Sequence, residues 1–177
     1  DVGWERALVP LPPPPPKPRA PEATFNWDVE PSEPFVIGKF YLDGSALDGP
    51  SAVLMRCGWS FVAVDEEGYV LAAAYGATPP WITDIGGAEA WALLQATYSA
   101  FPGACSFISG CKVMVDGLED GKRKALAGSP THPRVYALIF NAIEGLSLER
   151  IIWMPAHQGL KRLAGEPRVM ESCSPLK

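Results

Sequence analysis

The chain has 177 residues, of which 47% are hydrophobic and 20% are charged, and it carries a net charge of −5 with a pI of about 5.0. This composition is typical of a globular protein. Because proteins that rely on phosphate contacts usually carry a basic face, the acidic balance argues against a strong non-specific nucleic-acid binder. It permits an enzyme whose acidic side chains hold metal ions. No apolar run approaches the roughly 18 residues needed to cross a bilayer, so we expect no membrane partner.

Four cysteines give no sign of a zinc site, because none of them forms a CxxC pair. The start of the chain lacks the long apolar stretch of a signal peptide. We therefore expect reduced thiols and an intracellular location, in either the nucleus or the cytoplasm. The chain begins with Asp1 and not with Met, which we interpret as an internal piece of a longer protein.

Residues 1–34 are predicted to be a proline-rich disordered arm or linker. Proline has no N–H and fixes φ, so the stretch LPPPPPKPRAPEA favours an extended polyproline II conformation. Its PxxP spacing between Pro13 and Arg19 is typical of ligands for SH3- or WW-type domains. A spacer is the alternative, and the one we favour. Phe25 and Trp27 are expected to pack on the following domain and to end the linker.

A folded domain is predicted over residues 35–157. Residues 35–45 are apolar and aromatic up to an Asp-Gly-Ser turn signal, which is typical of a strand. Residues 58–65 alternate apolar and small or polar side chains, as a half-buried strand does. The turn at 66–68 then leads into a third strand over residues 69–76. Three strands in a row with short connections predict an antiparallel meander.

The rest of this domain is predicted to alternate helices and strands. Apolar residues recur at helical spacing over residues 86–101 and again over residues 133–146. Short apolar runs predict a fourth strand at 111–116 and a fifth at 150–154. The order β-β-β-α-β-α-β predicts an α/β fold. Its mixed five-stranded sheet would have three antiparallel strands, then parallel crossover strands, with helices on its faces.

Three acids stand out in this arrangement. Asp43 ends the first strand, Glu89 lies in the first turn of the first helix, and Asp116 ends the fourth strand. If the first and fourth strands are neighbours, the three carboxylates converge, and their repulsion favours a bound divalent cation. Two Mg²⁺ ions about 3.5–4 Å apart, or Mn²⁺ in their place, can activate a water and stabilise the leaving oxygen of a phosphodiester. Each acid alone has a structural interpretation, as a turn residue, a helix-dipole partner or a cap.

Four motifs in this order resemble those of a type 1 ribonuclease H domain of the kind that retroelement reverse transcriptases carry. They are FYLDGSA, GGAEAWALLQA, VMVDG and IIWMPAHQG, and the resemblance covers about 120 residues. It implies that Asp43, Glu89 and Asp116 bind the metal ions. It also implies that His157 assists proton transfer or product release, and that Ser45 contacts the substrate backbone.

The substrate that this resemblance implies is an RNA–DNA hybrid, whose RNA strand an endonuclease would hydrolyse. Such a hybrid is recognised by groove shape and by 2′-hydroxyl groups. Lys122, Arg123 and Lys124 form the local basic cluster and predict phosphate contacts along the duplex. An ordinary solvated turn explains the same cluster equally well.

The end of the chain departs from the family pattern. The family places a fourth acid on a helix soon after the histidine, usually in an Ala-Asp context. Residues 158–177 contain no Asp, and their two acids are Glu166 and Glu171. Glu166 precedes Pro167, which breaks a helix. We therefore interpret residues 158–177 as an atypical C-terminal tail. The alternative to an endonuclease is a catalytically impaired ribonuclease H fold that acts as a structural or nucleic-acid-binding domain.

Overall fold

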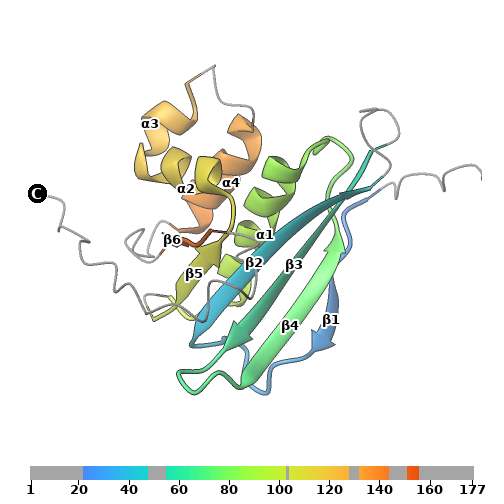
Figure 1. Cartoon of the computed structure of the whole chain (residues 1–177), viewed down its shortest axis with the longest axis vertical. Helices are drawn as coiled ribbons and strands as arrows, with labels where there is room; N and C mark the ends of the chain where they lie inside the picture. The colour runs from blue at the N-terminus through green and yellow to red at the C-terminus, as the bar shows by residue number, and fades with distance from the viewer. Residues whose placement is uncertain (1–21, 48–54, 103, 128–131, 144–150, 156–177) are drawn as a thin grey trace, which may run out of the picture.

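A computed structural model describes residues 22–47, 55–102, 104–127, 132–143 and 151–155 of the protein. In these residues six strands form one mixed sheet in the order β1-β4-β3-β2-β5-β6, and the helices pack against it (Figure 1). The strands are β1 (Asn26–Val29), β2 (Lys39–Leu47), β3 (Arg56–Val64), β4 (Val70–Ala77), β5 (Ser106–Ser109) and β6 (Ile151–Trp153). The helices are α1 (Ile85–Ser99), α2 (Lys112–Glu119), α3 (Lys122–Ala125) and α4 (Pro133–Ala142).

The predicted fold class is confirmed, but the predicted number of strands is wrong. Strands β2, β3 and β4 form the antiparallel part. Strand β5 pairs in parallel with β2, and β6 pairs in parallel with β5. The sixth strand is β1, which pairs antiparallel with β4 and lies among the residues that the sequence assigns to the arm. This strand was not predicted because it is short and has prolines on both sides, which made the whole segment look like a linker.

Two aromatic residues hold β1 on the domain, as predicted. The ring centroid of Phe25 lies 4.8 Å from that of Trp27 and 5.3 Å from that of Trp59. The ring of Trp27 meets Phe61 edge-on at 5.9 Å. Aromatic pairs at these separations add to the stability that their buried area gives. The edge of β4 is therefore covered by a strand that packs against the core through Trp27.

The central hairpin follows the sequence pattern closely. Trp59, Phe61 and Ala63 are buried, while the residues between them are half-buried or exposed. The turn into β4 uses Gly68 at φ 92°, in the left-handed region that glycine tolerates. Alternation of this kind places one face of β3 in the core.

The fourth strand differs in position from its prediction. It is β5, which ends at Ser109, and the predicted strand at 111–116 belongs mostly to helix α2. Met114, Val115 and Leu118 are buried at helical spacing, so the apolar run faces the core from a helix. The predicted neighbourhood of the first and fourth strands is confirmed, because β2 and β5 pair in parallel with Leu42 opposite Ser109.

Helix α1 covers one face of the sheet and forms the core with it. Asp84 caps its first turn by accepting a hydrogen bond from the Gly87 N–H at 2.8 Å. The helix begins at Ile85, so Glu89 lies in its second turn and not in its first. Helix α4 packs on α1 through Val135 and Ile139. This packing fixes α1 over β2 and so positions the residues at the centre of the sheet.

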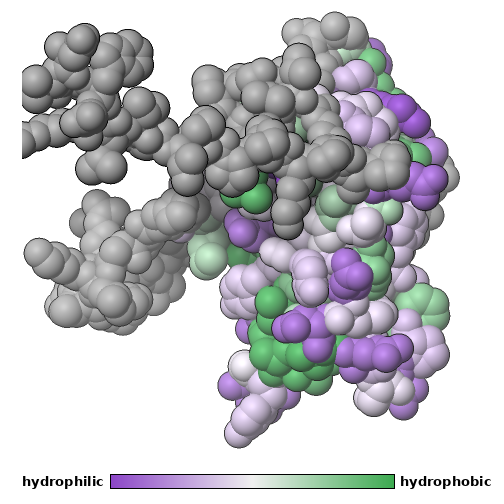
Figure 2. Space-filling model, turned by 90° about the vertical axis from the view of Figure 1, so that its right-hand side faces the viewer, coloured by the Kyte–Doolittle hydropathy of each residue, from purple (hydrophilic) through white to green (hydrophobic). Residues whose placement is uncertain are grey.

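Two further predictions concern the cysteines and membrane-spanning helices. Cys57, Cys105 and Cys111 are free thiols, and Cys57 is buried as expected for a core residue. No helix in the described part of the chain is long and apolar enough to span a membrane. On the face drawn in Figure 2, hydrophobic residues gather into a patch in the lower part, bordered by hydrophilic ones. Cys173 and the proline-rich segment up to residue 21 lie outside the described residues.

Candidate active site

A close approach between β2 and α1 brings the first two predicted acids together. A Cβ atom at Gly44 would lie 2.6 Å from the backbone nitrogen of Glu89 and 3.0 Å from the carbonyl carbon of Ala88. A real side chain does not fit at that distance, so glycine lets the helix rest directly on the strand. Asp43 comes just before Gly44, and its negative charge acts on the Glu89 carboxyl. Asp43 and Glu89 are therefore near enough for their charges to interact.

Glu89 is buried and receives a hydrogen bond. Only 7% of the residue is exposed. The Ser109 hydroxyl donates a hydrogen bond to Glu89 Oε2 at 3.0 Å. Burial raises the pKa of Glu89 above the usual value of 4.5, and the charge of Asp43 raises it further. Hydrogen bonds from Ser109 and from the Gly44 backbone oppose this shift. The net direction favours the neutral carboxylic acid.

Ser109 occupies the strand end at which the sequence analysis expects the third acid. It is the last residue of β5, lies opposite Leu42 of β2, and is 1% exposed. Its hydroxyl donates to Glu89 and accepts a hydrogen bond from the Cys111 N–H at 3.0 Å. Both roles of a hydroxyl are thus used within the protein.

The sequence reasoning missed Ser109, although a signal for it exists. The segment SFIS alternates half-buried and buried residues and is followed by Gly110, which is a common strand terminator. The Asp-Gly pair at 116–117 resembles the family motif more closely, so the fourth strand was predicted there and not at 106–109.

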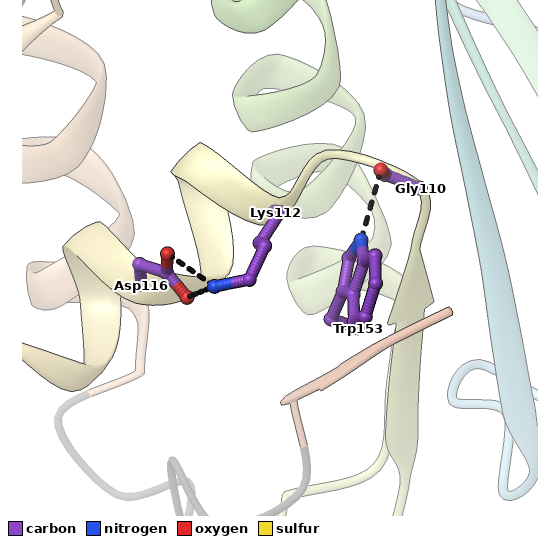
Figure 3. A network of polar contacts seen from close by, with 4 residues as sticks. All are labelled: Gly110, Lys112, Asp116 and Trp153. Atoms are coloured by element: carbon purple, nitrogen blue, oxygen red, sulfur yellow. Dashed lines mark hydrogen bonds and ion pairs between the residues drawn. The ribbon is translucent and has the colours of Figure 1, made fainter. Parts of the chain in front are cut away.

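Asp116 does not end a strand, which corrects its prediction. It lies on helix α2, where Lys112 Nζ is 2.9 Å from its Oδ1 and 2.7 Å from its Oδ2 (Figure 3). The two side chains are about half exposed and one helical turn apart. Lys112 also lies 5.9 Å from the ring centroid of Trp153, whose Nε1–H donates to the Gly110 carbonyl at 3.2 Å. Asp116 is therefore an ion-pair partner on the helix surface.

Asp116 lines a hollow beside α2. The hollow has a volume of about 900 Å³ and a mostly apolar lining that includes Asp116, Asp84 and His132. His132 Nε2 lies 2.9 Å from Asp84 Oδ1 within this lining. Neither Asp43 nor Glu89 belongs to it. The three predicted metal ligands thus divide between two places in the fold.

The residues present do not fit a site for two magnesium ions. Within the described ranges no group of three or more His, Cys, Asp or Glu side chains is arranged to hold a metal. What meets here is the buried Glu89 carboxyl and the Ser109 hydroxyl, with Asp43 near enough for its charge to act on Glu89. Hard divalent cations need several charged or carbonyl oxygens at short distances. The hydrogen bond from Ser109 gives the buried Glu89 carboxyl a partner within the protein.

The predicted substrate-binding residues are exposed but are only partly available. Ser45 lies on β2 two residues beyond Asp43, on the same face of the strand. Lys122, Arg123 and Lys124 form the surface of α3. Lys124 Nζ is 2.7 Å from Asp120 Oδ1, so part of the positive charge of this cluster is neutralised. His157, the fourth predicted catalytic residue, lies outside the described residues.

Comparison with known proteins identifies the fold. No family model and no curated protein matches the chain. The structure of the foamy viral protease–reverse transcriptase in complex with an RNA/DNA hybrid matches with a TM-score of 0.50 and 14% identity, over 77% of this chain and 20% of that chain. The native protease–reverse transcriptase of prototype foamy virus matches with a TM-score of 0.50 and 17% identity, over 72% and 18% of the two chains.

These likenesses show that the chain has a ribonuclease H-like fold, as its motifs implied. The chain spans about a fifth of the length of the foamy viral proteins that it matches. At these identities the fold alone is shared, so the activity has to be argued from the side chains of this chain.

Proposed function

We propose that this chain is a ribonuclease H-like domain that does not hydrolyse nucleic acid and that has a structural role in a larger protein or assembly. The observation that carries the proposal is the hydroxyl of Ser109 at the end of β5, hydrogen-bonded to Glu89 at 3.0 Å. Two-metal hydrolysis needs carboxylates that bridge and neutralise the cations. A neutral hydroxyl in that place supplies a weak ligand and no charge.

Two further features support the absence of hydrolysis. One is that Asp116, the third acid of the motif set, is ion-paired with Lys112 on the surface of α2. The sequence after His157 contains no Asp in the 20 residues up to Lys177. The fourth acid that the resemblance implies therefore has no match. Two of the four acids of the family pattern, Asp43 and Glu89, keep their place.

Hydrolysis of the RNA strand of an RNA–DNA hybrid is the second candidate function. Asp43 and Glu89 favour it, because these acids match the family motif and the charge of Asp43 acts on the Glu89 carboxyl. The fold is shared with a foamy viral enzyme whose structure was solved with an RNA/DNA hybrid. Under this candidate Mg²⁺ or Mn²⁺ would be held by Asp43 and Glu89 with water completing the coordination.

Binding of a hybrid without cleavage is less well supported than a structural role. The chain has a net charge of −5, and affinity for a duplex comes largely from cationic side chains that displace counterions. Lys112 is paired with Asp116 on α2, and Lys124 of α3 is paired with Asp120, the C-cap residue of α2. We therefore expect hybrid binding that is weak and that disappears at physiological salt.

The partner of the proline-rich arm and the cellular location stay predictions. An SH3- or WW-type domain is the partner that the PxxP spacing predicts, and a spacer remains the interpretation that we favour for the arm.

A cleavage assay tests the proposal against the second candidate. The full chain is incubated with an end-labelled RNA–DNA hybrid in Mg²⁺ and then in Mn²⁺, alongside Asp43→Asn. We expect no cleavage by either protein beyond a trace that both share, because a contaminating nuclease cleaves equally in both samples. Metal-dependent cleavage by the native chain that Asp43→Asn loses would overturn the proposal. Circular dichroism of both proteins checks that each is folded.

A further inference from the structure

The face of the sheet opposite α1 carries a continuous apolar row. Side chains alternate between the two faces of a strand. Helix α1 covers the face of Phe40 and Gly44, so Tyr41 points to the other face. The strand registers then place one residue from each of the six strands side by side on that face. From one sheet edge to the other the row is Val29, Ala73, Val62, Tyr41, Ile108 and Ile152.

This row is open to solvent at most of its positions. Tyr41 is 39% exposed, Val62 36% and Ile152 48%, whereas Phe40 and Phe61 on the α1 side are at most 1% exposed. Figure 1 looks onto this open face, with α1 behind the sheet. Ala73 and Ile108 are covered more than the other four residues of the row. Exposed apolar residues that gather beside charged ones are a feature of interaction surfaces.

The charges beside the row indicate which partner covers it. Lys39 and Asp43 lie two residues before and two residues after Tyr41 on β2, so they share its face, and both are exposed. If two copies face each other and are related by a two-fold axis that runs parallel to the row and passes Tyr41, their β2 strands run in opposite directions. Lys39 of each copy then lies opposite Asp43 of the other copy. A surface that is complementary to itself in this way is what a two-fold symmetric dimer requires.

We propose that two copies of this chain associate through the open faces of their sheets, with β2 lying on β2 in antiparallel orientation. Five inter-strand spacings of about 4.8 Å make the row about 24 Å long. Strands β2 and β3, of nine residues each, extend about 30 Å across the row, so the whole face approaches the ~800 Å² per partner of a standard interface. Facing sheets pack about 10 Å apart, a gap that an extended lysine and an aspartate span together. The inference goes beyond the structural role proposed above and does not depend on whether the chain hydrolyses RNA.

Sedimentation velocity of the full chain over a range of micromolar concentrations tests the dimer. We expect a dimer of twice the chain mass of 19.0 kDa. Val62→Lys places a charge in the row and should shift the species to monomer. Val113→Lys makes the same change at a residue of α2 that is 78% exposed and should leave the dimer intact. A dimer with even a weak dissociation constant, on the order of 100 μM, would be detected at that concentration. A native chain that stays monomeric there would overturn the proposal. Dimers that resist Val62→Lys would overturn it too.

A charge exchange tests the two-fold geometry. Lys39→Glu and Asp43→Lys should each weaken the dimer by about tenfold or more, because each puts like charges face to face. The double variant exchanges both signs and should restore the native dissociation constant within about threefold, since the same pairs form with reversed polarity. Failure of the double variant to recover, with both single variants folded by circular dichroism, would contradict the antiparallel β2 contact.

Discussion

The two halves of the candidate site keep the family pattern to different degrees. Where β2 meets α1, Asp43, Gly44 and Glu89 stand as the motifs predict, with the helix resting on the glycine. Where β5 leads into α2, the strand ends in Ser109, and the acid that resembled the motif lies on the helix, paired with Lys112. The first half therefore keeps the residues of the motifs, whereas the second half has a hydrogen-bonded serine at the strand end where the motifs predict an acid.

This difference indicates what holds each residue in place. A side chain larger than hydrogen at Gly44 would collide with the backbone of α1, so the fold itself constrains this position. At the end of β5 the fold requires a small buried group with a hydrogen-bond partner, and Ser109 meets this requirement without a metal ion. The ribonuclease H-like fold of this chain therefore accommodates a buried serine at the end of β5.

Gly44→Ala should have the largest effect on stability. The new methyl group would lie 2.6 Å from the Glu89 nitrogen, so α1 must shift away from β2, at a cost of about 3 kcal/mol in the free energy of unfolding. Gly86→Ala is the matched control, because its methyl group would come no closer than 3.4 Å to other atoms and lies in α1. That variant should be neutral or gain up to about 1 kcal/mol. Urea denaturation measures both, and equal stabilities for the two variants would contradict the close approach of α1.

Ser109→Ala should come next. It removes the donor to Glu89 Oε2 and the acceptor of the Cys111 N–H, and buried groups that lose their partners cost about 1–3 kcal/mol. Thr97→Val serves as the control, because the buried Thr97 hydroxyl donates only to the Leu94 carbonyl of its own helix, at 2.7 Å. We expect the control to lose less than about 1 kcal/mol. If thermal unfolding shows no difference between them, the Ser109–Glu89 contact does not stabilise the site.

The stability of the protein should depend on the ionisation of Glu89. Its pKa is raised in the folded state, mainly by burial, above the usual value of 4.5. The folded protein therefore binds this proton more tightly than the unfolded chain. The resulting stability is fully present below about pH 4.5 and is lost as the pH rises through the folded-state pKa.

Glu89→Gln should remove this part of the pH dependence, because glutamine stays neutral. Relative to the native chain, the variant should gain stability as the pH rises above about 4.5, as urea denaturation at a series of pH values would show. Glu66→Gln, at an exposed position of the hairpin turn, is the control and should leave the pH profile unchanged. A Glu89→Gln profile parallel to the native one would show that burial of this carboxyl does not govern its ionisation.

Asp116→Asn should have the smallest effect. The variant loses an ion pair between two side chains that are 58% and 51% exposed, and such pairs contribute less than about 0.5 kcal/mol on a helix surface. Thermal unfolding in low salt and in 1 M salt measures the loss, which should shrink with salt. A loss of 2 kcal/mol or more would mean that Asp116 has a buried role that its position on α2 does not indicate.

The parts of the fold that the sequence predicted are those with a long and regular pattern. The alternation around Trp59 and Phe61 and the helical spacing over α1 extend across enough residues to separate strand from helix. The run VMV at 113–115 is too short for that distinction, and its helical burial depends on contacts that the sequence does not show. Strand β1 has four residues and lies between prolines. It forms because the edge of β4 and the rings of Trp59 and Phe61 are there to receive it.

The candidate site was predictable to the same extent. Asp43 and Glu89 were found because their motifs lie on elements that the pattern places correctly. Ser109 was missed because an error in one strand moved the expected acid seven residues along the chain, from 109 to 116. The residue type gave no warning, since an Asp before a glycine is common at both strand ends and helix surfaces.

The measurement that tests the central claim most directly is Mn²⁺ binding by titration calorimetry at pH 7.5. It compares the native chain with Ser109→Asp and Asp116→Asn. If Ser109 holds the place of the missing ligand, the native chain and Asp116→Asn bind no Mn²⁺ at millimolar concentrations. Ser109→Asp, which sets a third carboxylate beside Asp43 and Glu89, then gains a saturable site. Saturable binding by the native chain that Asp116→Asn abolishes would contradict this account and return Asp116 to the metal site.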